Sequence, residues 1–411
     1  MNIVALVLLS IIGFCIGLTP LLYNGYKVYR VIPKTFGQLV ALRNLESEGL
    51  YDFWSEVRSL HEGVDLMVPP NLMKNFKIYL ENFNLDAQIF IEDVQKSIDK
   101  ERSNHRAFSP RHNLKSYQTL DEMNNWLQSL PALYPGIVET VVGGISYESR
   151  KILGVHVSYK SGNKAVFLEG GIHAREWIAP ATVTFILNEL LTSSDPSIRS
   201  VAQSRDWYIF PCVNPDGYEY TKIDRLWRKT RSRNGKCFGA DANRNWGYKW
   251  MQGGSNSNSC SNNFAGSAPF SEIENLSLSQ FIDSISANLE VYLSFHSYSQ
   301  LLLIPFGHQG LEVPKNNEEL HYVGNKAINA LAKRYGTKYE VGNFADTLYI
   351  ASGLSTDWVA AKYKVRLVYT FELRDTGKDG FLLPEEQIIP TGQETLDAVV
   401  SMIKQINNTC V

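Results

Sequence analysis

The chain has 411 residues, of which 44% are hydrophobic and 20% are charged, and its formal net charge is -2. This composition is typical of a globular protein with a real core and excludes a disordered chain. The near-neutral charge gives no reason to expect nucleic acid or an anionic membrane surface as a partner. Such a length exceeds one average domain and suits a large domain with a smaller one.

The chain begins with an almost entirely apolar run, Ile3–Leu18. Such a run is short for a membrane-spanning helix and typical of the hydrophobic region of a signal peptide. The triplet Cys15–Gly17 offers the small-x-small pattern of a cleavage site. We therefore predict a signal peptide over 1–18 and a secreted protein, although no Lys or Arg precedes the run. An uncleaved membrane anchor is the alternative, and no later segment is a candidate membrane span.

Residues 19–106 predict a small separate domain. The alternation of apolar and polar residues over Tyr26–Ile32 predicts a strand, and 35–48 has the spacing of a helix. Short strand or helix pieces follow at 63–68, 76–82 and 88–91, and a helix is predicted at 93–102. This order favours a small α+β sandwich with antiparallel strands.

From about residue 100 to 111 the chain is polar and basic and has no apolar period. Exposed linkers of this kind are where proteolysis concentrates. Trypsin-like proteases cut after basic residues, which makes Arg106 a candidate cleavage site, with Arg102 and Arg111 as alternative sites. The cut would divide 19–106 from a second domain, 107–411. A plain interdomain linker is the other interpretation.

The second domain alternates strand and helix patterns. Strands are predicted at 137–142, 152–159, 207–213 and 367–373, and helices at 180–192, 320–335 and 393–406. This alternation predicts an α/β domain with a central, largely buried sheet. Functional residues are then expected at one edge of the strands.

Two further strands each deliver a histidine. His173 and Glu176 follow the apolar run Ala165–Leu168, and the run from Val291 ends at His296. Two His and one carboxylate are a ligand set that catalytic zinc takes while a fourth position stays open. Because this is not the HExxH helix motif, Glu176 would itself be a ligand and the base must come from elsewhere. Glu372 is the candidate base, because a carboxylate inside an apolar run is costly to bury unless it has an ion-pair partner or a catalytic role.

Six segments together resemble the zinc carboxypeptidase A/B family, in the family's order and with near-family spacing. They are GIHAREW (171–177), LWRKTRS (226–232), DANRNW (241–246), FHSYSQLLL (295–303), SGLSTDW (352–358) and FELRDTG (371–377). The resemblance covers the chain from about residue 110 to the C-terminus. It implies a central mixed eight-stranded sheet flanked by helices, preceded by an activation domain at 19–106 that covers the active-site cleft.

The resemblance also implies a role for each site residue. His173, Glu176 and His296 would bind one zinc ion per chain. Glu372 would be the general base, and Arg228 would stabilise the negative charge of the tetrahedral intermediate. Without the resemblance, Arg228 would be interpreted as part of a solvated basic loop.

Residues that recognise the substrate follow from the same resemblance. Asn243 and Arg244 would grip the C-terminal carboxylate of a peptide, which Arg suits because its guanidinium is planar. Tyr349 would close over that carboxylate, and Arg175 would lie near the substrate backbone. Together these residues would make the enzyme an exopeptidase.

Side-chain preference is set, in the family, by the residue just before Asp357. A-type enzymes hold an apolar residue there and B-type enzymes an Asp, whereas this chain has Thr356. Leu354 and Phe344 would make the pocket shallower and apolar. We therefore expect release of aliphatic or aromatic residues. Asp346 leaves open the alternative that basic residues are preferred, if its side chain faces inward.

The cysteines and sequons complete the expectations for a secreted chain. Cys237 and Cys260 match positions that the family bridges, so a disulfide is implied between them. Cys212 is expected to be a buried thiol and Cys410 to be unpaired. Sequons begin at Asn275 and Asn407, and either could carry glycan if exposed.

The sequence therefore predicts a secreted, monomeric zymogen of a zinc metallocarboxypeptidase. Its partners would be peptide and protein C-termini and an activating trypsin-like protease, with no nucleic acid and no membrane. Besides a preference for basic residues, the alternative is an inactive relative that binds peptide C-termini without cutting them.

Overall fold

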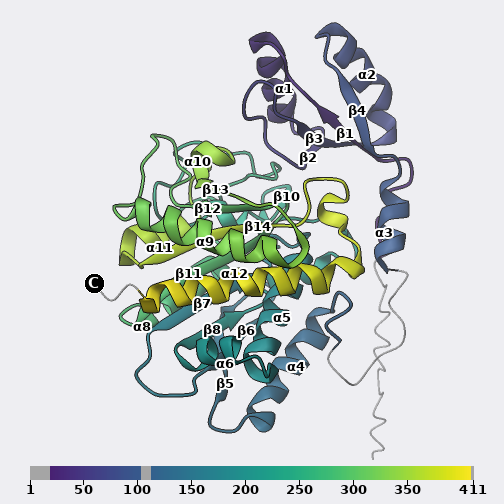
Figure 1. Ribbon diagram of the computed structural model, residues 1–411. Coiled ribbons are helices and arrows are strands. Elements are labelled where there is room, and N and C mark those ends of the chain that lie inside the picture. Colours follow the sequence, from purple (N-terminus) through teal and green to yellow (C-terminus); the bar gives the residue numbers. More distant parts are fainter. Residues whose placement is uncertain (1–18, 103–112, 409–411) are drawn as a thin grey trace, which may run out of the picture.

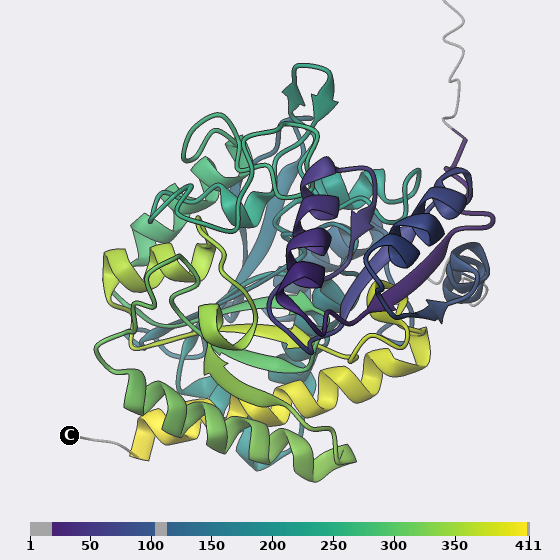
Figure 2. The same ribbon diagram turned by 90° about the horizontal axis from the view of Figure 1, so that it is seen from above.

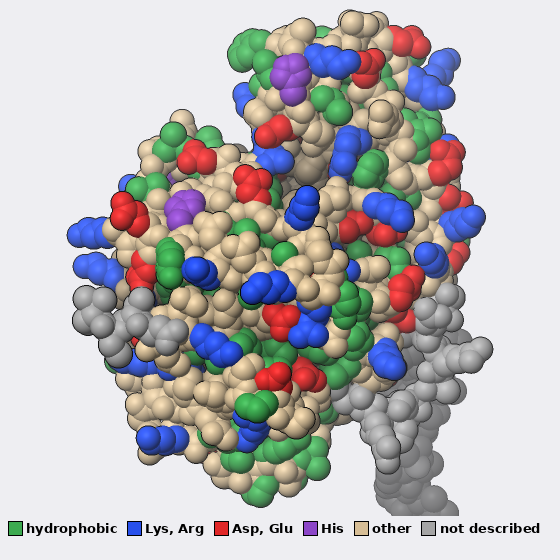
Figure 3. Space-filling model, viewed as in Figure 1, with side chains coloured by type: hydrophobic (Ala, Val, Ile, Leu, Met, Phe, Trp, Pro, Cys, Tyr) green, Lys and Arg blue, Asp and Glu red, His purple; other side chains and the backbone are tan. Residues whose placement is uncertain are grey.

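A computed structural model describes residues 19–102 and 113–408 (Figure 1). The predicted signal peptide, the predicted cut after Arg106, and Cys410 lie outside these ranges. Within them, no helix combines the length and apolar character needed to cross a membrane. On the face shown in Figure 3, acidic and basic side chains are interspersed, in keeping with the near-neutral net charge.

The smaller domain is a four-stranded antiparallel sheet with the order β2-β3-β1-β4. Its elements are β1 (Lys27–Val31), α1 (Phe36–Glu48), β2 (Asp52–Phe53), β3 (Val64–Val68), α2 (Met73–Asn82), β4 (Ala87–Ile91) and α3 (Val94–Arg102). The predicted antiparallel α+β domain is confirmed, and the undecided piece at 76–82 is helical. Thr35 begins α1 with a capping box closed by Gln38, which satisfies free amides of the first turn.

The two faces of this small sheet have different partners. Tyr29 and Val31 pack under α1 and α2, in an apolar cluster of the domain itself. Val28 and Met67 point the other way and pack against Phe381 of the larger domain. Alternation along the strands thus supplies both a core and an interface. Figure 2 shows the small domain from above, seated over the larger one.

The connecting helix α3 is fixed to the larger domain by a buried ion pair. Glu101 Oε2 and Oε1 accept from Arg225 Nε and Nη2, each at 2.6 Å. Both side chains are buried. The contact lies at the end of α3, shortly before the basic linker.

The larger domain holds a mixed eight-stranded sheet with the order β13-β12-β14-β11-β7-β8-β6-β5. The strands are β5 (Val138–Ile145), β6 (Lys151–Val157), β7 (Ala165–Gly170), β8 (Asp206–Phe210), β11 (Leu289–Ser297), β12 (Leu301–Ile304), β13 (Glu340–Asn343) and β14 (Leu367–Leu373). The central strands β14, β11, β7 and β8 are parallel, and β14, β11 and β7 are almost entirely buried. Such burial explains why they are continuous apolar runs in the sequence.

Helices cover both faces of this sheet (Figure 1). One apolar cluster joins the sheet to α4 (Leu120–Leu133), α5 (Ile178–Thr192), α9 (Asn317–Tyr335) and α12 (Ile388–Asn408). A second cluster joins the other face to α8 (Ile273–Ile285) and α11 (Ser355–Tyr363). The sequence patterns located α5, α9 and α12, with α12 starting earlier than expected, but did not predict α4, α8 or α11.

Three expectations about the cysteines and sequons have clear outcomes. Cys237 and Cys260 form a disulfide, with 5.2 Å between their Cα atoms. Cys212 is a buried free thiol, as expected. Asn275 is buried on α8 and its Nδ2 donates to the carbonyl of Ala242 at 2.6 Å, so the glycan considered there is excluded in the folded protein.

Candidate active site

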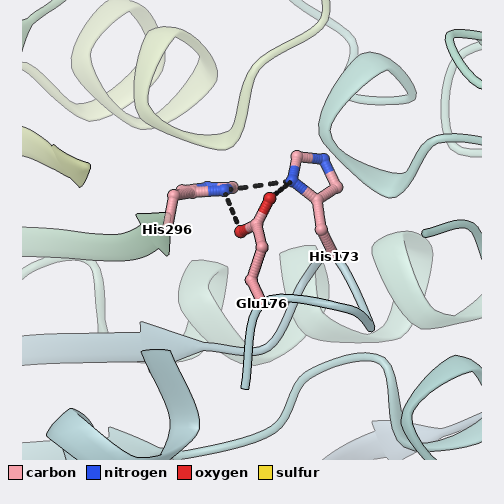
Figure 4. Close-up of side chains that lie close together, drawn as sticks. All are labelled: His173, Glu176 and His296. Atoms are coloured by element: carbon pink, nitrogen blue, oxygen red, sulfur yellow. Dashed lines mark hydrogen bonds and ion pairs between the residues drawn. The ribbon is translucent and has the colours of Figure 1, made fainter. Parts of the chain in front are cut away.

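Three side chains from two separate parts of the chain meet at the carboxyl ends of β7 and β11 (Figure 4). His173 and Glu176 lie in the loop after β7, and His296 is near the end of β11. Their potential ligand atoms all lie within 4.8 Å of one another, and all three residues are buried. Figure 4 shows the Glu176 carboxylate pointing between the two imidazoles.

The donor atoms of this cluster fit a zinc ion. Glu176 Oε1 lies 2.8 Å from His173 Nδ1, and Oε2 lies 3.0 Å from His296 Nδ1. Burial opposes ionisation of Glu176, but the two imidazoles outweigh it and hold its pKa below the usual value. Two imidazole nitrogens and one carboxylate are the donors that catalytic zinc prefers, with room for a fourth ligand. The predicted zinc site is therefore confirmed.

Asp241 orients one of the ligands. Its Oδ1 lies 3.0 Å from His173 Nε2, which leaves Nδ1 facing the cluster. Its Oδ2 accepts from Arg228 Nη2 at 2.7 Å and from Nε at 3.1 Å. Burial would raise the pKa of Asp241, but Arg228 and His173 hold it well below the usual value. A charged carboxylate behind a ligand imidazole fixes its tautomer and raises its basicity.

Glu372 lies next to the metal cluster. It is on β14 and pairs in register with His296 of the parallel neighbour β11. Glu372, His173, Glu176, Arg228 and Tyr349 line one cavity. Burial and the nearby Glu176 carboxylate raise the pKa of Glu372 well above its ordinary value, against the effect of Arg228 and Arg244. A bound cation would act in the same direction as these arginines.

Arg244 is fully buried and holds a carboxylate of the small domain. Its Nη2 donates to Glu56 Oε1 at 2.9 Å. Its Nε donates to the carbonyl of Gly254 at 2.8 Å, so the guanidinium is fixed in place. Asn243 is its neighbour, and Asn243 Oδ1 accepts from the Ser355 amide at 2.9 Å. The Tyr349 ring lies 5.6 Å from the Arg244 guanidinium carbon.

Arg175 holds a second carboxylate of the small domain, that of Asp52. Its Nη1 donates to Asp52 Oδ1 and Oδ2 at 3.1 and 3.0 Å. Trp54 packs beside this contact on Phe381, with 5.2 Å between ring centroids. The small domain thus occupies the cleft in front of the metal cluster.

Two of the residues predicted for the side-chain pocket are brought together. Leu354 and Phe344 belong to one buried apolar cluster, against which Tyr349 packs. Thr356 is buried, and its hydroxyl lies 3.4 Å from that of Thr370. Asp346 lies on the short helix α10 (Phe344–Thr347) and is exposed, so its inward orientation is excluded.

Sequence reasoning missed Asp241, Asp52 and Glu56. Asp241 is the first residue of the segment DANRNW, and its place three residues before Arg244 in a buried segment is a local signal. Asp52 and Glu56 have no such signal, because their roles arise only when the two domains dock.

Comparisons with known proteins agree with this geometry. The family described as "Zinc carboxypeptidase" matches residues 123–398, and the "Carboxypeptidase activation peptide" family matches 29–101. Zinc carboxypeptidase A 1 of Anopheles gambiae is 44% identical over 392 residues, 93% of this chain and 90% of that protein. Carboxypeptidase B of Astacus astacus is 44% identical over 299 residues, 72% of this chain and 98% of that protein.

A solved structure extends the likeness to both domains. The crystal structure of thrombin activatable fibrinolysis inhibitor has a TM-score of 0.87 at 32% identity, over 94% of this chain and 100% of that one. The catalytic and activation families both match, and the buried His173, Glu176 and His296 form the metal site. The chain belongs to the zinc carboxypeptidase family and is a zymogen with its activation domain in place.

Proposed function

We propose that this enzyme, once its activation domain is removed, hydrolyses the C-terminal peptide bond of peptides with Glu372 as general base. The observation that carries the proposal is the cavity that Glu372 and Arg228 share with the metal ligands His173 and Glu176. Bound zinc supplies Lewis acidity, which acidifies water and polarises a carbonyl. Glu372 would take the proton of the attacking water and pass a proton to the leaving amine.

Arg228 would stabilise the negative charge that develops on the carbonyl oxygen. Asp241 fixes its guanidinium through two hydrogen bonds, so it needs no reorganisation during the reaction. Preorganised donors of this kind typically contribute a few kcal/mol, roughly 3, to transition-state stabilisation.

Arg244 would make the enzyme an exopeptidase. It is buried, and a carboxylate from the activation domain occupies it here. A substrate without a free C-terminal carboxylate would leave this cation unpaired, which disfavours internal peptide bonds. Asn243 beside it and Tyr349 over it are the other residues proposed to hold the terminal carboxylate.

The contacts between the activation domain and these arginines account for the latency of the zymogen. Glu56 on Arg244 and Asp52 on Arg175 block the places where a peptide would bind. Cleavage in the basic linker, after Arg106 in our proposal, would allow the activation domain to leave. Secretion as a monomer, through a signal peptide over 1–18, is part of the same proposal.

The pocket favours aliphatic or aromatic C-terminal residues. Leu354 and Phe344 give it apolar walls, and Thr356 carries no charge that would attract Lys or Arg. The exposure of Asp346 removes the residue that had argued for a basic preference. Relatives with equal identity are named both carboxypeptidase A and carboxypeptidase B, so this preference rests on the pocket residues alone.

A direct test compares the trypsin-treated wild type with Glu372→Gln on peptides ending in Leu, Phe, Lys or Arg. We expect the wild type to release Leu and Phe, with a chelator abolishing release. The variant should lose about 10²- to 10⁴-fold in kcat while its zinc content stays unchanged. Retention of wild-type kcat by the variant would disprove the role of Glu372, and faster release of Lys or Arg would disprove the apolar preference. No release from any peptide by the zinc-loaded wild type would instead favour the binding-only alternative.

A further inference from the structure

A buried carboxylate lies on the sheet one residue before the end of β7. Glu169 is 0% exposed, and its Oε1 accepts from Ser355 Oγ at 2.8 Å. Among the residues that the structure describes, its Oε2 has no hydrogen-bond partner. A carboxylate that is buried with an unpartnered oxygen is costly, so its presence calls for a role. The reaction proposed above does not use Glu169.

Glu169 belongs to a polar row across the parallel strands. Its neighbour in register on β11 is Ser294, whose neighbour on β14 is Thr370. Residues that pair in register on parallel strands point to the same face of the sheet. The first turn of α11 covers this face, because Ser355 contacts Glu169 there. The next residue, Thr356, has its hydroxyl 3.4 Å from that of Thr370. The sheet therefore supports the start of α11 through polar contacts.

The start of α11 also contacts the residues proposed to hold the terminal carboxylate. Ser355 N donates to Asn243 Oδ1 at 2.9 Å. Two residues earlier, the Gly353 carbonyl accepts from Trp246 N at 3.1 Å. Gly353 has a φ of 73°, and a Cβ at this position would lie 2.2 Å from the Arg244 carbonyl oxygen. Asn243 and Arg244 are thus packed directly against this segment, so a shift of the segment would move them.

We propose that Glu169 is a positioning residue for substrate binding. Its carboxylate holds Ser355 from the side of the sheet, and Ser355 in turn holds Asn243 in place to bind the terminal carboxylate. A hydrogen bond to a charged acceptor is stronger than a neutral one, which suits this task. Glu169 does not touch the substrate, because it is buried beneath α11. This inference rests on the proposed function, because it requires a terminal carboxylate at Asn243 and Arg244.

The test uses trypsin-activated, zinc-loaded enzyme and peptides that end in Leu or Phe. Glu169→Gln keeps the shape of the side chain but removes the charge that accepts from Ser355. We expect KM to rise about tenfold, the effect of one charged hydrogen bond. The terminal carboxylate is bound alike in the ground state and the transition state, so kcat should change less than about twofold. The Ki of free leucine, a product that carries the same carboxylate, should rise by the same factor as KM.

A matched control separates positioning from stability. Glu274 on α8 is another buried carboxylate, which accepts from the Tyr147 amide at 3.0 Å. Its Oε2 likewise has no hydrogen-bond partner within 19–102 and 113–408. Glu274→Gln should keep the wild-type KM and the wild-type Ki for leucine, whatever its Tm. If Glu169→Gln lowers Tm or zinc content but leaves KM and Ki unchanged, the proposal is overturned.

A second variant tests whether the effect runs through Ser355. Ser355→Ala removes the donor and should raise KM by a similar factor. When both changes are combined, KM should rise no further than in either single variant, because they remove the same contact. Effects that multiply in the combined variant would overturn the proposal.

Ser355→Ala also decides the question if Glu169→Gln does not fold. Unchanged KM and Ki for leucine in Ser355→Ala would then overturn the proposal. Failure of the zinc-loaded wild type to release Leu or Phe from any peptide would instead overturn the proposed function.

Discussion

Asp241 Oδ1 lies 3.0 Å from His173 Nε2, on the side of the imidazole away from the other two zinc ligands. The contact holds Nδ1 toward the metal position and couples the ligand to Arg228 through the second carboxylate oxygen. The metal site and Arg228, for which we propose the oxyanion role, thus share one buried carboxylate.

Asp241→Asn should weaken zinc binding. The amide cannot supply the negative charge that raises the basicity of His173, and loss of such a partner typically costs 10- to 100-fold in metal affinity. Competition with a chelator of known affinity measures the change. Asp346→Asn, which removes an exposed acid of the same domain, should leave the affinity unchanged. Equal affinities for Asp241→Asn and the wild type would show that Asp241 does not tune the metal.

Glu56→Gln should loosen the activation domain. The variant keeps the shape of the side chain but removes the charge that faces Arg244, and we expect a loss of about 1–3 kcal/mol from one charged hydrogen bond. The Kd of the separated activation domain for the mature enzyme should rise by about 5- to 150-fold. Inhibition of peptide hydrolysis by the added domain measures this Kd. Glu48→Gln, which changes an exposed acid on α1, serves as the control. If the Glu56→Gln domain inhibits as strongly as the Glu48→Gln domain, the Glu56–Arg244 ion pair is not the main contact.

Asp357 predicts a pH-dependent stability. Burial raises its pKa from 3.8 to about 8, while one oxygen accepts from the Gly307 amide at 2.9 Å. A raised pKa means that the folded state binds the proton more tightly, so the stabilisation is complete below about pH 4 and is lost as the pH rises toward 8. Asp357→Asn should therefore show a smaller fall in Tm than the wild type between about pH 5 and pH 8.5. Parallel pH profiles of Tm for the wild type and Asp357→Asn would contradict the role of Asp357 in this pH dependence. Asp346→Asn is the control, and its profile should follow that of the wild type.

The disulfide should stabilise the larger domain. Cys237 and Cys260 are 23 residues apart, and closing a loop of this length contributes about 3 kcal/mol in the chain-entropy description. Replacing both by Ser should lower the denaturant concentration at the midpoint of unfolding, without altering zinc content. An unchanged midpoint would mean that the Gly/Ser/Asn-rich loop is already ordered without the bond.

The zinc ligands could be predicted because their signal is local. His173, Glu176 and His296 each follow or end an apolar run, and the carboxyl ends of parallel strands meet at one edge of a sheet. Arg244 and the Cys237–Cys260 pair came from motifs with family spacing. The disulfide is confirmed, whereas Arg244 holds the Glu56 carboxylate here and its role toward a substrate stays a prediction.

The features that could not be predicted depend on distant packing. Asn275 belongs to a sequon, but only the position of α8 against Ala242 shows that it is buried. Asp346 lies close to pocket residues in sequence, yet the turn of α10 directs it to solvent. The contacts of Asp52 and Glu56 require the docked domains, which no periodicity in either segment encodes.

We expect the Glu101–Arg225 ion pair to separate cleavage of the linker from the appearance of activity. Glu101 precedes the proposed cut after Arg106, so hydrolysis there leaves this buried pair, and the contacts of Asp52 and Glu56, intact. The severed domain then behaves as a bound inhibitor that must dissociate. The lag before full activity would accordingly be set by a dissociation rate encoded in the interface, and not by the amount of activating protease.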